Sequence, residues 1–295
     1  MPTRPTEITF TGAGGDRLVA SSYAAHGQAG RTVLLLHGGG QTRHAWHGAA
    51  RTLAAAGLTA VALDQRGHGD SAWPAGGDYA FADFAADAAL VADAIAASEG
   101  ARPALVGASL GGIAALLAMG ARPNVFAATV LVDVTPSLDP RGVAGVRAFM
   151  GARARDGFAD VGEAAAAIAA YLPHRPRPAS LDGLRKNLRR RDDGRLYWHW
   201  DPRFLDGPRP IGNHDAGLLA ALSAAARDAA VPLLLVRGRD SELVGESELA
   251  EFRALCPRAE IADISGARHM VAGDRNDAFS AAVVGFFTRR FGGAA

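Results

Sequence analysis

Short apolar runs alternate with longer stretches of helical periodicity along most of the chain. Apolar runs of about four to eight residues bounded by Gly or polar residues are typical of buried strands. The expected strands are residues 6–10, 18–23, 31–36, 58–63, 104–106, 125–132, 231–236 and 259–264. The expected helices are residues 45–56, 79–97, 112–119, 218–229, 247–255 and 278–291. This alternation favours a doubly wound, mostly parallel α/β sheet, with the first two strands as an antiparallel edge.

The alternation is interrupted between Asp133 and Val231. Residues 143–155 and 161–171 have helical patterns there, separated by Pro- and Arg-rich segments, so this stretch is too long for a simple crossover connection. We interpret residues 138–215 as a helical cap over the carboxyl edge of the sheet, and residues 1–137 and 216–295 as the core. The Arg-rich run 185–195 is interpreted as a solvated helix face.

The most informative motif is the sequence GASLG at residues 107–111, between an expected strand and an expected helix. In this context G-x-S-x-G places its serine on a strained strand-to-helix turn. Gly107 and Gly111 permit the close approach of neighbouring backbone, and the free N–H groups at the helix start favour an oxyanion. The motif therefore predicts Ser109 as a nucleophile.

Charge and cysteine content narrow the classes of partner. The chain has 31 basic and 30 acidic residues, which gives no broad attraction for nucleic acid or an anionic membrane. Cys256 is the only cysteine, so neither an intrachain disulfide nor a cysteine metal cage is expected. His44 and His47 lie close together without an evident third ligand, and we expect no metal and no cofactor. The first ten residues contain no apolar signal segment, which predicts a cytoplasmic protein.

Four segments together resemble the α/β-hydrolase superfamily. They are HGGG at 37–40, DQRGHGDS at 64–71, GASLG at 107–111 and GARHM at 266–270. The wider sequence is similar to capped bacterial serine esterases and to epoxide hydrolase-like or cofactor-free haloperoxidase-like members. The resemblance implies an eight-stranded sheet with a cap inserted after the sixth strand. Serine at position 109 argues against the aspartyl ester intermediate of epoxide hydrolases and haloalkane dehalogenases.

The resemblance also implies roles for residues outside the elbow. The general base is expected on the loop after the last strand, and His269 is the only histidine beyond His214. The oxyanion donors are expected to be the backbone N–H groups of Leu110, next to the nucleophile, and of Gly39.

The acid that orients the base has more than one candidate. Many family members carry it three positions after the glycine that ends the seventh strand, but here that position is Ser241, flanked by Asp240 and Glu242. Other members carry it after the sixth strand, where Asp133 follows Ser109 by 24 residues. We favour Asp133 and retain Asp240 and Glu242 as alternative acids.

An aromatic cluster at residues 197–200 is a candidate pocket lining beneath the cap. The residues considered for this pocket are Trp46, Phe149, Met150, Trp198, His199, Trp200, Phe204 and His214. For any single one of them, packing of the cap onto the core is the alternative interpretation, and we favour it.

These residues favour a serine hydrolase that cleaves a carboxylic ester or lactone through an acyl-enzyme. The substrate is expected to be a small molecule. The same constellation also serves C–C bond hydrolases, lyases and perhydrolases acting as haloperoxidases, and it is found in non-enzymatic small-molecule receptors. The sequence does not separate these alternatives, because fold and triad are shared among them.

Overall fold

A single mixed sheet organises the protein. The computed structural model describes residues 4–27, 31–175, 180–212 and 215–291. Eight strands form the sheet in the order β1-β2-β4-β3-β5-β6-β9-β10, and all neighbours from β4 onward are parallel. Their bounds are β1 Thr6–Thr11, β2 Arg17–Tyr23, β3 Val33–Leu36, β4 Ala60–Leu63, β5 Ala104–Ala108, β6 Thr129–Val132, β9 Leu233–Gly238 and β10 Glu260–Ile264. The expected fold class, with its antiparallel edge hairpin, is confirmed.

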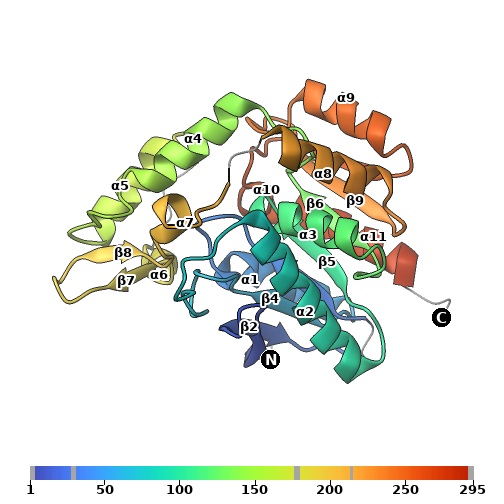
Figure 1. The fold of residues 1–295 in the computed structure, drawn as a ribbon, viewed down its shortest axis with the longest axis horizontal. Coiled ribbons are helices and arrows are strands. Elements are labelled where there is room, and N and C mark those ends of the chain that lie inside the picture. The colour runs from blue at the N-terminus through green and yellow to red at the C-terminus, as the bar shows by residue number, and fades with distance from the viewer. Residues whose placement is uncertain (1–3, 28–30, 176–179, 213–214, 292–295) are drawn as a thin grey trace.

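Helices cover both faces of the sheet (Figure 1). One core cluster packs the sheet against α2 (Phe81–Glu99), α3 (Leu110–Ala121), α8 (Ala216–Arg227) and α9 (Glu246–Leu255). A second cluster packs the other face against α1 (His47–Ala55) and α11 (Asn276–Phe291). The central strands β3 to β6 are almost entirely apolar and buried, because both of their faces are covered by helices.

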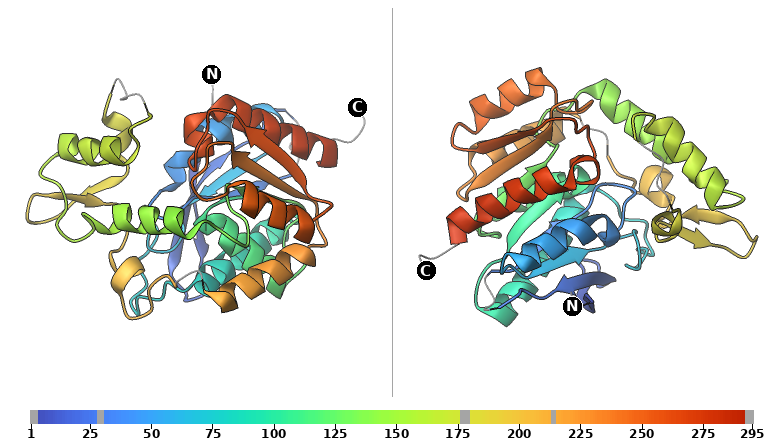
Figure 2. Two further views of the ribbon diagram at one scale, coloured as in Figure 1. Left: turned by 90° about the horizontal axis from the view of Figure 1, so that it is seen from above. Right: turned by 180° about the vertical axis from the view of Figure 1, so that it is seen from behind.

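Residues 140–206 leave the sheet after β6, and we call them the inserted segment. Its elements are α4 Pro140–Gly151, α5 Val161–Tyr171, α6 Asp182–Arg185, β7 Leu188–Arg190, β8 Leu196–Trp198 and α7 Arg203–Asp206. The segment stands to one side of the sheet and its helices, at the left of Figure 1, and both views of Figure 2 show the same separation. A third apolar cluster joins it to the core through Tyr79, Phe84 and Leu110.

Two local expectations were wrong. The Arg-rich run 185–195 does not form a helix face; after Arg185, the last residue of α6, it supplies β7 and the turn that leads into β8, and β7 and β8 pair as an antiparallel hairpin. The guanidinium groups of Arg189 and Arg191 lie over the ring of Trp73, an arrangement that a helical reading misses. The strand expected from residue 125 begins at Thr129, because Val125 and Phe126 enter the core in an irregular turn.

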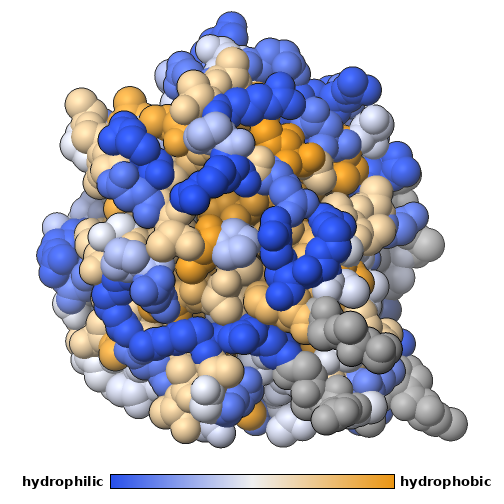
Figure 3. All heavy atoms as spheres, turned by 90° about the vertical axis from the view of Figure 1, so that its right-hand side faces the viewer, coloured by the Kyte–Doolittle hydropathy of each residue, from blue (hydrophilic) through white to orange (hydrophobic). Residues whose placement is uncertain are grey.

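The surface combines hydrophilic and apolar areas. On the side of α9 and the end of α11, hydrophilic residues surround smaller apolar areas (Figure 3). None of the helices in the described part of the chain combines the length and the apolar character that crossing a membrane requires.

Candidate active site

Ser109 lies in a strained turn between β5 and α3. Its backbone has φ 46° and ψ −112°, a conformation that few non-glycine residues adopt. Steric crowding explains why the motif has glycine at both positions. A Cβ on Gly107 would lie 2.5 Å from the Gly111 carbonyl oxygen, and one on Gly111 would lie 2.4 Å from the Leu36 carbonyl oxygen. The close approach of β3, β5 and α3 therefore requires glycine at both positions.

Asp133 follows β6, the strand next to β5, and it is the other described non-glycine residue with positive φ, at 49°. Its side chain is fully buried and accepts three hydrogen bonds. Oδ1 accepts from the Gly238 N–H at 3.0 Å, whereas Oδ2 lies 2.5 Å from Ser241 Oγ and 2.8 Å from His269 Nδ1. These bonds fix the carboxylate and orient the imidazole.

The two alternative acids lie elsewhere. Asp240 is exposed, and Glu242 is half-buried, with an Oε2 atom that no described residue hydrogen-bonds. Neither contacts His269, whereas Ser241, which lies between them, turns its hydroxyl toward Asp133. Residues 239–244 form a turn and bends after β9, in which the Ser241 N–H donates to the Gly238 carbonyl at 3.1 Å, and this turn brings the Ser241 hydroxyl to Asp133.

His269 lies on the loop between β10 and the short helix α10 (Val271–Asp274). This loop is held in place because Asp274 accepts from the Arg268 N–H at 3.0 Å and pairs with Arg175 of the inserted segment at 2.6 Å. Among the described residues, no side chain makes a hydrogen bond with the Ser109 hydroxyl. His269 thus contacts Asp133 directly through its side chain. Ser109 is placed near them because it follows β5, the strand next to β6, and its N–H donates to the carbonyl of Val132, the residue before Asp133.

The loop of residues 37–40 follows β3, the strand on the other side of β5. A Cβ on Gly38 would lie 3.5 Å from Ser109 Cβ, so the loop passes beside the serine. The Gly38 N–H donates to Gln41 Oε1 at 3.0 Å, and the Gly40 N–H donates to His68 Nε2 at 3.1 Å. No described residue accepts a hydrogen bond from the N–H of Gly39, which lies between these two bonded groups.

Two buried histidines contact this loop, and both imidazole rings are neutral. His37 Nδ1 lies 2.8 Å from the Gly38 carbonyl, and its Nε2 accepts from the Gln65 N–H at 3.1 Å. Since a carbonyl only accepts, Nδ1 carries the proton. Burial lowers the pKa of His37 to about 4 and that of His68 to about 3, because the protein interior disfavours the charged imidazolium.

Comparisons with known proteins identify the family. A family model described as alpha/beta hydrolase fold matches residues 31–275. The chain belongs to the α/β-hydrolase family. It is 33% identical over 232 residues to esterase Rv0045c of Mycobacterium tuberculosis, covering 75% of this chain and 70% of that protein. It is 31% identical over 214 residues to 2-(acetamidomethylene)succinate hydrolase of Mesorhizobium japonicum, covering 72% and 73%.

Solved structures of α/β hydrolases match over almost the whole chain. The crystal structure of E-2-(acetamidomethylene)succinate hydrolase has a TM-score of 0.79 at 25% identity, covering 96% of this chain and 99% of that one. A structure of the M. tuberculosis esterase Rv0045c has a TM-score of 0.72 at 26% identity, covering 97% and 92%. This α/β hydrolase is therefore an enzyme with hydrolase activity on small molecules.

Side chains of the inserted segment cover the loop of residues 37–40 in this α/β hydrolase. A Cβ on Gly40 would lie 3.0 Å from Met150 Cε and 3.6 Å from Trp200 Nε1, and one on Gly39 would lie 3.6 Å from Phe204 Cζ. Phe149 instead stacks on Tyr171 at 4.1 Å between ring centroids and also contacts Trp198. The sequence did not identify Tyr171, which has no motif to mark it.

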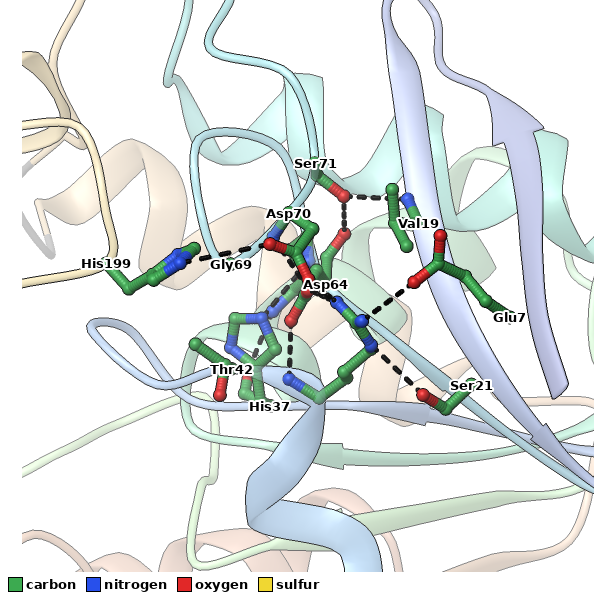
Figure 4. Close-up of polar contacts among 12 residues, drawn as sticks. Glu7, Val19, Ser21, His37, Thr42, Asp64, Gly69, Asp70, Ser71 and His199 are labelled. Carbon is green, nitrogen blue, oxygen red and sulfur yellow. Dashed lines mark hydrogen bonds and ion pairs between the residues drawn. The ribbon is translucent and has the colours of Figure 1, made fainter. Parts of the chain in front are cut away.

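Of three further pocket candidates, two contact other parts of the protein and the third lies outside the described residues. Trp46 packs against Phe279 in the core beneath α1, because it ends the short helix η1 (Arg43–Trp46) and faces the sheet. His199 lies beside the loop of residues 64–71, where its Nε2 is 3.8 Å from Asp70 Oδ1 (Figure 4). Burial and the charge of Arg189 lower the His199 pKa. His214 lies outside the described residues.

The described residues contain no cluster of three or more His, Cys, Asp or Glu side chains that would hold a metal ion.

A groove of about 640 Å³ is lined by residues that include Arg31, Thr32, Glu99 and Arg290. It lies at the amino ends of the parallel strands, opposite the edge that carries Ser109, and contains none of the candidate residues.

Proposed function

We propose that this enzyme hydrolyses a carboxylic ester through an acyl-enzyme, with Ser109 as nucleophile, His269 as base and Asp133 as the acid that orients it. The observation that carries the proposal is the 2.8 Å contact between His269 Nδ1 and Asp133 Oδ2, one strand away from the strained Ser109 turn. A buried carboxylate bound to Nδ1 leaves Nε2 free to accept the serine proton. Contacts between nucleophile and base often form only in the substrate complex.

The reaction has two balanced steps. Ser109 Oγ attacks the ester carbonyl and its proton passes to His269 Nε2, while the oxyanion binds the N–H groups of Leu110 and Gly39. The tetrahedral adduct collapses, and the alcohol leaves with the proton from His269. Water then attacks the acyl group under the same base, and the acid is released with Ser109 restored. The Gly39 N–H, from which no residue in the described ranges accepts a hydrogen bond, supports its role as a donor.

We propose that residues 138–215 form a cap over this site and that 1–137 and 216–295 form the core. The contacts of Met150, Trp200 and Phe204 with the loop of residues 37–40 support this division. These side chains bound the site with apolar surface and exclude water from the oxyanion, which strengthens its hydrogen bonds.

The test combines covalent labelling with turnover. A fluorophosphonate probe should label the wild-type enzyme at Ser109, located by peptide mass spectrometry, and the Ser109→Ala variant should stay unlabelled. A panel of p-nitrophenyl esters of increasing chain length should be hydrolysed by the wild type only. Absence of both labelling and turnover in the wild type would refute the proposal.

A second candidate is hydrolysis of an N-acyl enamine amide, favoured by the similarity to 2-(acetamidomethylene)succinate hydrolase. The same acyl-enzyme chemistry applies, with an amine as the leaving group. Labelling of Ser109 together with negligible turnover of every ester, and with turnover of an N-acetyl enamine, would favour it. Labelling without any of these turnovers would direct attention to C–C bond cleavage, lyase or perhydrolase chemistry.

A further inference from the structure

His68 contacts the proposed oxyanion loop from behind. The residue is fully buried, and its Nε2 accepts the Gly40 N–H at 3.1 Å. Its Nδ1 lies 2.9 Å from the Arg66 carbonyl, which only accepts, so Nδ1 carries the proton and Nε2 the lone pair. Burial keeps the ring neutral, since it lowers the pKa of His68 to about 3.

This bond affects the neighbouring peptide group. Gln41 binds the N–H of Gly38, and His68 binds the N–H of Gly40. The two peptide groups that flank the one carrying the Gly39 N–H are therefore each fixed by a side chain. Glycine has wide backbone freedom, so three consecutive glycines without such bonds would sample many orientations of the central N–H. An oxyanion donor is effective only when it is oriented before the reaction.

The inserted segment holds His68 in turn. His68 and Trp200 form an antiparallel bridge, flanked by bonds from the Gly69 N–H to the His199 carbonyl at 2.7 Å and from the Asp201 N–H to the Gly67 carbonyl at 2.8 Å. The ring of Phe204 stands edge-on to the imidazole at 5.1 Å between centroids. The backbone and the ring of His68 are thus both covered by one short stretch of the inserted segment.

The core side of the same loop is fixed by Asp64 (Figure 4). Asp64 accepts from the Asp70 N–H at 2.9 Å and from the Arg43 N–H at 2.6 Å, and it pairs with the Arg43 guanidinium. Ser71 Oγ donates to the Asp64 carbonyl at 2.5 Å. His68 therefore projects from a rigid loop toward Gly40.

We propose that His68 is a positioning residue that holds the Gly39 N–H in the oxyanion hole and is itself kept in place by the docked inserted segment. The proposal rests on the proposed function, because it needs an oxyanion at this loop. His68 does not touch the substrate; it acts through the peptide group of Gly40.

The experiment compares His68→Leu, which removes the acceptor, with His68→Gln, which retains one on a side chain of similar reach. Three quantities are measured well below each variant's melting temperature: kcat and KM for an ester, the rate of fluorophosphonate labelling, and the Kd of phenylboronic acid, whose serine adduct is tetrahedral. For His68→Leu we expect kcat, labelling rate and boronate affinity each to fall by about 10-fold to 100-fold with little change in KM. His68→Gln should recover most of the loss.

Phe252→Leu is the matched stability control, because Phe252 is a residue of α9 that is buried in the core, away from this loop. It should lower the melting temperature while labelling rate and boronate affinity stay within about twofold of wild type. If the wild type is labelled and His68→Leu matches its labelling rate and boronate affinity, the His68 proposal is wrong while the proposed function stands. If the wild type is not labelled, the proposed function itself has failed.

The role of the inserted segment has its own test. Tyr79→Phe removes the hydroxyl that donates to Asp201 at 2.7 Å, which loosens the docked stretch without touching the loop of residues 37–40. The variant should lower boronate affinity in the wild-type background and change it little in the His68→Leu background. Equal losses in both backgrounds, or no loss in the wild-type background, would show that the segment does not act through His68.

Discussion

Ser241 Oγ donates a hydrogen bond of 2.5 Å to Asp133 Oδ2, the oxygen that also contacts His269 Nδ1. Ser241 stands three positions after Gly238, where many α/β hydrolases carry the acid. A hydroxyl therefore occupies the usual place of the carboxylate, and the carboxylate reaches the same imidazole from the end of the adjacent strand. The hydroxyl helps to fix the orientation of the Asp133 carboxylate, since it donates a hydrogen bond to the oxygen that faces His269.

This arrangement predicts that the acid can be moved. Asp133→Asn should lower kcat for an ester by roughly 10³-fold to 10⁴-fold, because an amide favours the wrong imidazole tautomer. Adding Ser241→Asp to Asp133→Asn should restore at least about tenfold of the loss. Asp240→Asn and Glu242→Gln are the controls and should stay within about threefold of wild type. A loss in either control as large as that in Asp133→Asn would overturn the assignment.

Ser241→Ala tests the supporting hydroxyl alone. Ser241 Oγ also accepts from the N–H groups of Leu243 at 3.0 Å and Val244 at 3.1 Å, so the variant leaves these backbone groups without their partner. We expect a loss of about 2 kcal/mol in the free energy of unfolding and a fall of about threefold to tenfold in kcat. Chemical denaturation and steady-state kinetics measure the two effects. An unchanged kcat together with the lower stability would show that the hydroxyl supports only the loop.

The strands and the three candidate catalytic residues could be predicted from short stretches of sequence. Ser109 follows from a motif between a strand and a helix, whereas the resemblance to the α/β hydrolases implies His269, the only histidine beyond His214, and Asp133, which follows Ser109 by 24 residues. The structure places the last two within 2.8 Å, and their chemical roles stay predictions. The eight strands were foreseen because buried parallel strands read as uninterrupted apolar runs.

Other contacts were not predictable, because they join segments far apart along the chain. The sequence marks His68 only as part of the segment DQRGHGDS at 64–71, and its bond to Gly40 spans 28 residues. Trp46 is a candidate pocket residue by its aromatic character, with packing as the favoured interpretation, and η1 turns it toward Phe279 on the core side. The Arg-rich run supplies one strand and the turn of a hairpin, and in it Arg189 and Arg191 lie over Trp73, a partner that no local propensity reveals.

Met150 bounds the proposed oxyanion loop, with its Cε 3.7 Å from the place of a Cβ on Gly39. Met150→Ala removes this flexible side chain and leaves space beside the scissile carbonyl. We expect the ratio of kcat/KM for long-chain to short-chain p-nitrophenyl esters to rise by at least about fivefold, which corresponds to about 1 kcal/mol. Met119→Ala, in the buried face of α3, is the matched control and should lower stability without altering that ratio. An unchanged ratio in Met150→Ala would exclude Met150 from the specificity pocket.

The two neutral histidines predict that stability falls in mild acid. His37 and His68 have folded-state pKa values of about 4 and about 3, lowered from 6.5 by burial, so the unfolded chain binds more protons below pH 6.5. Their contribution is fully present above that pH and is lost as the pH falls toward the folded values. Between pH 7 and pH 5 each contributes a loss of about 2 kcal/mol in the free energy of unfolding.

Denaturant unfolding at pH 7 and pH 5 measures this difference, and His68→Leu supplies the comparison. The variant is less stable at pH 7 because it leaves the Gly40 N–H without its acceptor, yet it has one fewer buried imidazole to protonate. Its pH 7-to-5 loss should therefore be smaller than that of the wild type by about 2 kcal/mol. Carboxylates held at low pKa, such as Asp93 at about 2 beside Arg122, titrate below this window and do not mimic the effect. Equal pH dependence in the two proteins would mean that the His68 ring is not kept neutral by its burial.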